Sequence, residues 1–287
     1  MLRTYLIIAL ALWGLWTATA TAQNAKAVKL VAEFEAAYRA LNFRVATEAA
    51  EQLTKQHSNE ASARTAIAYY LFLQNNYSRA WEYARLAQPQ EQGKLVYTMI
   101  ASNIGLKTQN YPEVLTFTQA FLDKSTDKDP RRFRANILAY RAQAQKELRK
   151  YEDALKSINA ALALEPTIAG YLTQRAEIYF WLKRPADALA ELDKLEETYG
   201  SMLTEEERIT TLRVRAESQY AMEKWNESLE AWTALLELAP EDIPALRARA
   251  EVYMELEQTR SACGDLKKAA ALGDAVSRTN LQRLGCK

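Results

Sequence analysis

The feature that most constrains this chain is a helical segment that returns after 34 residues (185 − 151). Residues 151–166 read YEDALKSINAALALEP, and their apolar side chains fall on one face at helical pitch before Pro166 ends the helix. Ala135 to Leu148, immediately upstream, predict another helix, so the two form a hairpin with its break near Arg149 and Lys150. The same offset relates residues 225–240 to residues 259–274.

Small side chains occupy equivalent positions in successive hairpins. In the first helices these are Ala142, Ala176, Ala216 and Ala250, and in the second helices Ala154, Ala188, Ser228 and Ala262. Second helices are opened by Tyr77, Tyr111, Tyr151 and Trp225, and two of them are closed by Pro166 and Pro240. The pattern resembles the tetratricopeptide repeat, in which small residues let helices approach closely. This resemblance implies an all-α fold, a right-handed α-solenoid of about seven helix-turn-helix repeats with a C-terminal capping helix.

With this period the rest of the chain can be divided into repeats, and residues 23–287 are expected to form one solenoid. The repeats start near Ala27, Ala61, Leu95, Ala135, Ala169, Ile209 and Ile243. Two steps are longer, and their extra residues fall in the polar stretches Asp123 to Pro130 and around Gly200. Thr204 and Glu207 form a capping box that opens the next helix. The first repeat departs from the pattern with Phe34 in a small-residue position, and residues 275–286 are expected to cap the last repeat.

Residues 1–22 have the composition of a secretory signal peptide. Arg3 is followed by an apolar run from Tyr5 to Trp16 and by small residues ending in Ala20-Thr21-Ala22. The apolar run is shorter than the ~20 residues that span a bilayer, so we expect cleavage rather than a membrane anchor. The remaining chain has equal numbers of acidic and basic residues and therefore no long-range field for nucleic acid or anionic lipid. We expect a periplasmic or secreted protein that binds no nucleic acid and does not insert into the membrane.

The sequence gives little support for catalysis. His57 is the only histidine, which excludes a multi-histidine metal site within the chain. No glycine-rich phosphate loop and no nucleophile elbow is present in the sequence. We therefore expect no enzymatic activity, no catalytic residue, no metal site and no cofactor, and we place His57 in solvent at a helix end.

Two cysteines lie near the end of the chain. Cys263 falls in the last second helix and Cys286 at the end of the capping helix, at similar distances from the turn at Gly273 and Asp274. In an exported protein such an even pair predicts a disulfide. The alternative is two buried thiols that never oxidise.

In proteins of the family that the chain resembles, the first helices line a concave groove that receives a partner segment. Helical spacing along these helices predicts a groove face formed by Tyr38, Tyr69, Phe72, Met99, Asn103, Leu106, Glu177, Phe180 and Tyr220. Its aromatic and apolar side chains suit an apolar or aromatic ligand segment. The alternative is that some of them pack against the neighbouring repeat instead.

These features predict a non-catalytic scaffold or adaptor of the cell envelope, whose concave groove binds another protein or peptide segment. Such a scaffold is expected to be monomeric. The alternative is a structural module that associates with copies of itself through its exposed repeat ends or edges. Light scattering on the purified chain distinguishes the two.

The first testable prediction concerns processing. Because small residues precede Gln23 in a signal-peptidase pattern, the exported protein should begin at Gln23. Amino-terminal sequencing of the exported protein checks this, and an intact Met1 would exclude both the signal peptide and the expected compartment.

Overall fold

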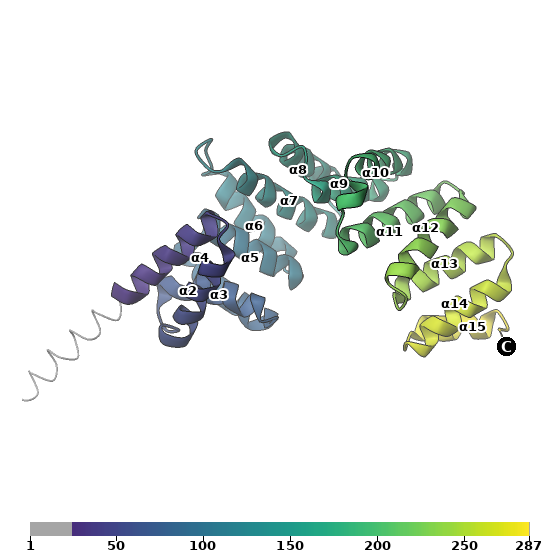
Figure 1. Cartoon of the computed structure of the whole chain (residues 1–287), viewed down its shortest axis with the longest axis horizontal. Helices are drawn as coiled ribbons and strands as arrows, with labels where there is room; N and C mark the ends of the chain where they lie inside the picture. Colours follow the sequence, from purple (N-terminus) through teal and green to yellow (C-terminus); the bar gives the residue numbers. More distant parts are fainter. Residues whose placement is uncertain (1–24, 287) are drawn as a thin grey trace, which may run out of the picture. The chain divides into compact units, whose positions relative to one another are not determined.

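The computed structural model describes residues 25–286, and every regular element among them is helical (Figure 1). The all-α class of helical hairpins predicted from the sequence is thereby confirmed. The chain divides between Leu148 and Arg149 into two compact units. Residues 1–24, which include the predicted signal peptide and Gln23, lie outside the described part. Within the described part, no helix is long and apolar enough to cross a membrane.

The N-terminal unit consists of paired helices that pack on their neighbours along the chain. Its helical segments are residues 25–39, α2 (Phe43–Gln56), η1 (Ala61–Ala63), α3 (Arg64–Leu73), α4 (Tyr77–Glu91), α5 (Leu95–Lys107), α6 (Tyr111–Leu122) and α7 (Arg131–Glu147). The first helices of successive hairpins also pack on one another, α3 on α5 and α5 on α7. They therefore form a continuous inner layer of this unit.

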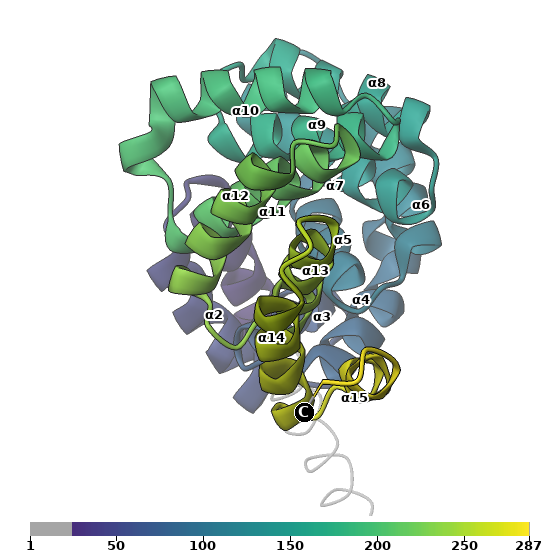
Figure 2. The same cartoon turned by 90° about the vertical axis from the view of Figure 1, so that its right-hand side faces the viewer.

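The C-terminal unit repeats the same arrangement. Its helical segments are α8 (Tyr151–Leu164), α9 (Ala169–Trp181), α10 (Pro185–Tyr199), η2 (Gly200–Met202), α11 (Glu205–Ala221), α12 (Trp225–Leu238), α13 (Ile243–Glu255), α14 (Thr259–Ala271) and α15 (Ala275–Arg283). The last helix, α15, packs on α14, as Figure 2 shows for the yellow end of the chain.

Each first helix ends in a single residue with left-handed backbone geometry. These residues have φ between 57° and 61° and are Leu41, Asn75, Gln109, Arg149, Lys183, Glu223 and Glu257. They are 34 or 40 residues apart, as 75 − 41 and 149 − 109 show, which are the steps between the predicted repeat starts. The amide of the following residue closes the turn, since Lys224 N donates to Gln219 O at 2.9 Å. This bond satisfies a carbonyl in the last turn of the helix and reverses the chain within a very short connection.

The small residues of the repeat lie where the two helices of a hairpin meet. Ala176 and Ala188 are fully buried on α9 and α10, and Ala216 is fully buried on α11. Ser228 takes the equivalent place on α12, where its Oγ donates to the carbonyl of Ala216 at 2.9 Å. The hydroxyl is therefore satisfied inside an otherwise apolar contact.

The third hairpin compensates for a larger residue at this contact. Val114 stands on α6 where other second helices carry alanine or serine, and it is fully buried. Gly105 faces it from α5, and a Cβ added to Gly105 would lie 2.6 Å from Val114 Cγ2 and 3.2 Å from Trp81 Cζ3. The missing side chain of Gly105 thus makes room for the added methyl groups of Val114.

The two insertions set helix starts. Residues 123–130 form a turn in which Thr126 N donates to Asp129 Oδ2 at 2.8 Å, and α7 begins directly after Pro130. The predicted start near Ala135 is therefore one turn too late. After the second insertion, Thr204 and Glu207 form the predicted capping box, with Thr204 N donating to Glu207 Oε2 at 2.9 Å.

The expectation that His57 faces solvent is wrong. His57 follows α2 and is only 7% exposed, because η1 packs back on α2 immediately after it. Its backbone N–H donates to Leu53 O at 2.9 Å, whereas its Nε2 has no hydrogen-bond partner among the described residues.

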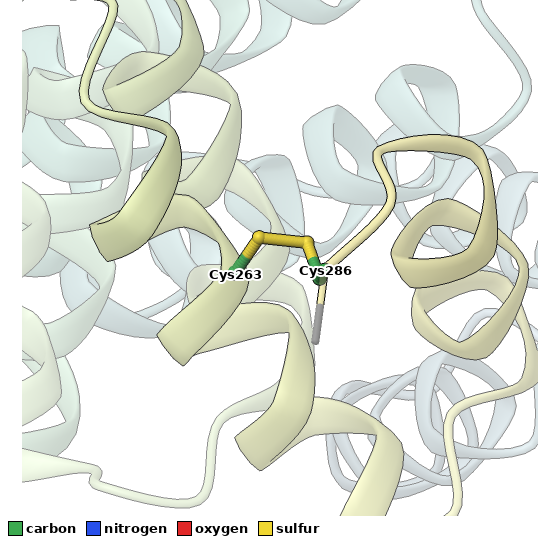
Figure 3. The surroundings of a disulfide bond; sticks show 2 residues. All are labelled: Cys263 and Cys286. Atoms are coloured by element: carbon green, nitrogen blue, oxygen red, sulfur yellow. A yellow bond between two sulfur atoms is a disulfide. The ribbon is translucent and has the colours of Figure 1, made fainter.

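A disulfide joins Cys263 of α14 to Cys286, which follows α15, with the two Cα atoms 5.7 Å apart (Figure 3). Beside it, Leu281 and Leu284 pack on a small core formed by Ala250, Ala262 and Leu266. Covalent and apolar contacts together attach the last helix to the last hairpin.

The second testable prediction uses the third hairpin. Gly105→Ala gains about 1 kcal/mol of helix propensity but forces a clash with Val114 that costs about 1–3 kcal/mol, so the variant should melt lower than the parent. In a Val114→Ala background the clash partner is gone, and the same substitution should raise the melting temperature. Calorimetry of the four proteins tests this, and the same sign in both backgrounds would contradict the assigned contact.

The third prediction concerns the disulfide. Titration of unfolded, unreduced protein should find no free thiol. Replacing both cysteines with serine should cost about 3 kcal/mol, because the bridge restrains the loop between Cys263 and Cys286 in the unfolded chain. Denaturant unfolding of the double variant measures this loss. Two reactive thiols in the exported parent would refute the pairing.

Candidate functional site

An aromatic cluster occupies the inner layer of the N-terminal unit, with Tyr38 at its centre. Four rings surround Tyr38, with centroid distances of 6.0 Å to Phe34, 5.7 Å to Phe43, 5.6 Å to Tyr69 and 6.5 Å to Phe133. The rings of Phe43 and Tyr69 meet it edge to face, and that of Phe133 lies nearly parallel to it. These side chains come from residues 25–39, α2, α3 and α7, so the cluster ties the first hairpin to the start of the fourth.

A cavity of about 270 Å³ opens beside this cluster. It is lined by Tyr38, Leu41, Phe43, Tyr69, Phe72, Leu73, Met99, Ile100, Asn103, Phe133, Asn136 and Tyr140. None of these lining side chains carries a charge at neutral pH. The cavity is therefore suited to an uncharged, mainly apolar group.

Apolar side chains surround the mouth of the cavity and remain open to solvent. Leu41 is 46% exposed, Phe43 48% and Leu73 42%. Large apolar residues that gather at one exposed place on a soluble protein mark an interaction surface more often than scattered ones do. Three of them around one cavity make this the strongest candidate site in the N-terminal unit.

Inside the cavity, the polar atoms are few and incompletely paired. Tyr69 Oη lies 3.5 Å from Thr47 Oγ1, a long contact. Among the described residues, the hydroxyls of Tyr38 and Tyr140 have no hydrogen-bond partner, although Tyr38 is only 9% exposed. Burial raises the pKa of both tyrosines, and the neighbouring Tyr140 and Tyr69 raise that of Tyr38 further. Both hydroxyls therefore stay protonated near neutral pH and can donate a hydrogen bond.

The structure brings five of the nine predicted groove residues together in this cavity: Tyr38, Tyr69, Phe72, Met99 and Asn103. Leu106 lies half-buried further along α5 and is not part of the lining. The expectation of a continuous open strip needs correction, because Tyr38, Tyr69 and Met99 are at most 9% exposed and belong to the core. Curvature of the inner layer packs these rings against each other and leaves an enclosed hollow.

The other predicted groove residues lie in the C-terminal unit. Glu177 and Phe180 are half-buried on α9, where the Phe180 ring lies 5.5 Å from that of Trp181. Tyr220, on α11, lines a separate cavity of about 210 Å³ together with Arg247, Glu251 and neighbouring residues. This lining is charged, unlike that of the cavity in the N-terminal unit.

Four lining residues were missed by the sequence analysis. Phe133 lies in the extra first turn of α7, ahead of the predicted repeat start, and Asn136 and Tyr140 follow it on the same helix. Phe43 opens α2 at the position of the aromatic residues Tyr77 and Tyr111 in later hairpins. The recurrence of that aromatic position was the one signal that pointed to Phe43.

The C-terminal unit holds a larger and more polar cavity, of about 620 Å³, between α10, α11 and α12. Asp193, Glu196, Glu197 and Glu237 stand around it, and Arg215 of its lining pairs with Asp193 at 2.6 Å. The part of the chain that the structure describes contains no group of three or more His, Cys, Asp or Glu side chains placed to hold a metal ion.

Hairpins of this kind, with uncharged and charged hollows between their helices, define a helical-repeat protein. A sequence model of the tetratricopeptide repeat matches residues 31–93 and 141–201. These two segments are tetratricopeptide repeats, and the remaining hairpins share their geometry.

Known proteins support the same fold. The chain is 27% identical to the DnaJ homolog subfamily C member 7 homolog of Schizosaccharomyces pombe over 114 residues, which cover 38% of this chain and 23% of that protein. The structure superposes on that of the Cut9–Hcn1 hetero-tetramer of the APC/C with a TM-score of 0.69 and 13% identity, covering 90% of this chain and 48% of the other. It also resembles a tetratricopeptide repeat protein from Parabacteroides merdae, with a TM-score of 0.53 and 18% identity, covering 78% and 98% of the two chains.

The limited coverage sets what these similarities carry. The chain spans about a quarter of the yeast relative and about half of the Cut9–Hcn1 chain, and both identities are low. The superpositions therefore establish the solenoid fold. Tetratricopeptide repeats are in general non-catalytic modules that bind protein or peptide partners.

Proposed function

We propose that the protein is a non-catalytic adaptor of the cell envelope that binds a segment of another protein through the cavity of its N-terminal unit. The observation that carries the proposal is the exposed apolar mouth of Leu41, Phe43 and Leu73 around an uncharged hollow. Exposed apolar area around a pocket is what a partner's anchor residue buries when it binds. The location in the envelope rests on the signal-peptide pattern of residues 1–22.

The occupant is an uncharged side chain on a partner segment. A charged group would lose its hydration in the hollow without meeting an opposite charge on the lining. An apolar anchor instead releases water from the ring faces and from the leucines at the mouth. The bond then depends on one anchor and a small number of surrounding contacts, as in other interfaces with a central hot spot.

The fourth prediction tests this surface. Crosslinking of the parent protein in its native envelope should identify a specific partner. The double variant Phe43→Ser with Leu73→Ser should weaken binding of that partner by ~2 kcal/mol or more, measured with purified components. Its melting temperature should fall only a few degrees, because both side chains are more than two-fifths exposed.

A matched control is available in the same unit. Val28 is 56% exposed and Leu86 46%, and neither lines the cavity. Val28→Ser with Leu86→Ser should leave binding unchanged. Equal loss in both double variants, or none in either, would move the binding surface away from the cavity. Light scattering that finds dimers in the parent and monomers in the mouth variant would favour self-association instead.

A further inference from the structure

We infer that the anchor taken by the cavity is an aromatic side chain with an uncharged polar tip, a tyrosine or a tryptophan of the partner. The inference rests on the proposed function and specifies its ligand. Three observations carry it: the size of the hollow, the absence of charge on its lining, and two tyrosine hydroxyls in it that have no partner among the described residues.

The size of the hollow favours an aromatic group. A cavity of about 150 Å³ is sufficient for a benzene-sized ligand, and the present one measures about 270 Å³. The surrounding rings of Phe43, Phe72 and Phe133 offer faces and edges to an inserted ring. An aliphatic side chain would fill less of the volume and would leave part of these rings without contacts.

The lining argues against a charged tip. The polar groups in it are the hydroxyls of Tyr38, Tyr69 and Tyr140 and the amides of Asn103 and Asn136. None of them neutralises a charge, so an ammonium or carboxylate would be desolvated without an ion-pair partner. Asn103 is exposed at the edge, where it can contact the backbone of the partner segment.

The unpaired hydroxyls favour a polar tip over none. Tyr38 is nine-tenths buried, and neither its hydroxyl nor that of Tyr140 has a hydrogen-bond partner among the described residues. A purely apolar anchor would displace water from both hydroxyls and leave them unsatisfied. A phenol or an indole N–H brings a group that hydrogen-bonds to one of them, while its ring fills the apolar part of the hollow.

The test uses small probes in place of the unidentified partner. Toluene, p-cresol and p-toluate share one ring and differ only in their substituent. Titration of the full chain carrying ¹³C-methyl methionine follows binding at Met99, which lines this cavity, while Met254 of the C-terminal cavity serves as an internal control. We expect p-cresol to bind about tenfold more tightly than toluene, and p-toluate to shift the Met99 signal least.

A conservative variant separates the hydroxyl from the ring. Tyr38→Phe keeps the ring contacts and should reduce the preference for p-cresol to about threefold or less, and the pair Tyr38→Phe with Tyr140→Phe should abolish it. Tyr83→Phe, in the same unit but outside the lining, should leave the preference intact. Melting curves show whether each variant is folded.

Several results would overturn the inference. They are equal or tighter binding of toluene, p-toluate binding as tightly as p-cresol, no shift at Met99 with any probe, or a preference that survives in the double tyrosine variant. These failures are distinguishable from failure of the proposed function. Loss of partner binding in the mouth variant together with no preference for p-cresol would keep the adaptor and exclude only this anchor.

Discussion

The close approach of the two helices in each hairpin is the contact on which the rest of the structure depends. It requires small side chains at one position of each helix, met by the buried pairs Ala176 with Ala188 and Ala250 with Ala262. A larger residue there would separate the helices and shift every contact with the next hairpin. The third hairpin obeys the same constraint in another way, since Gly105 gives up its side chain where Val114 is larger. The constraint applies to the summed volume at the contact rather than to a particular residue.

Because this contact and the left-handed turn fix each hairpin, the inner face is free to vary. In the N-terminal unit that freedom is used for aromatic side chains. Rings are flat and stiff, and around Tyr38 they meet at interplanar angles from 28° to 89°. Rings at such angles do not fill the space between curved helices, and the remaining volume is the cavity. The same side chains thus belong to the core and to the binding site, so truncating Tyr69 would damage both.

The sequence was sufficient for the features that depend on the period and insufficient for those that depend on curvature. Left-handed residues such as Arg149 and Glu223 fall at the intervals that the repeat predicted, because the turn is set locally by one residue. The cavity brings Tyr38 within 6.5 Å of Phe133, three hairpins later, and no local pattern encodes that distance. The insertion before α7 also moved Phe133 outside the assumed register. Five of the predicted residues nevertheless line the cavity, since helical spacing alone identifies the inner face.

In the C-terminal unit the same freedom produces a different surface. Arg175 and Arg249 occupy equivalent positions on α9 and α13, and each pairs with an acid on the following helix, Glu191 at 2.6 Å and Asp265 at 2.8 Å. The hairpin between them carries Ala231 at the position of those acids, so Arg215 pairs with Asp193 instead, at the edge of the charged cavity. One substitution at a position that does not set the helix spacing therefore redirects an ion pair from within a hairpin to the boundary between two hairpins. Variation of this kind lets a repeat protein change what it binds while every hairpin keeps its geometry.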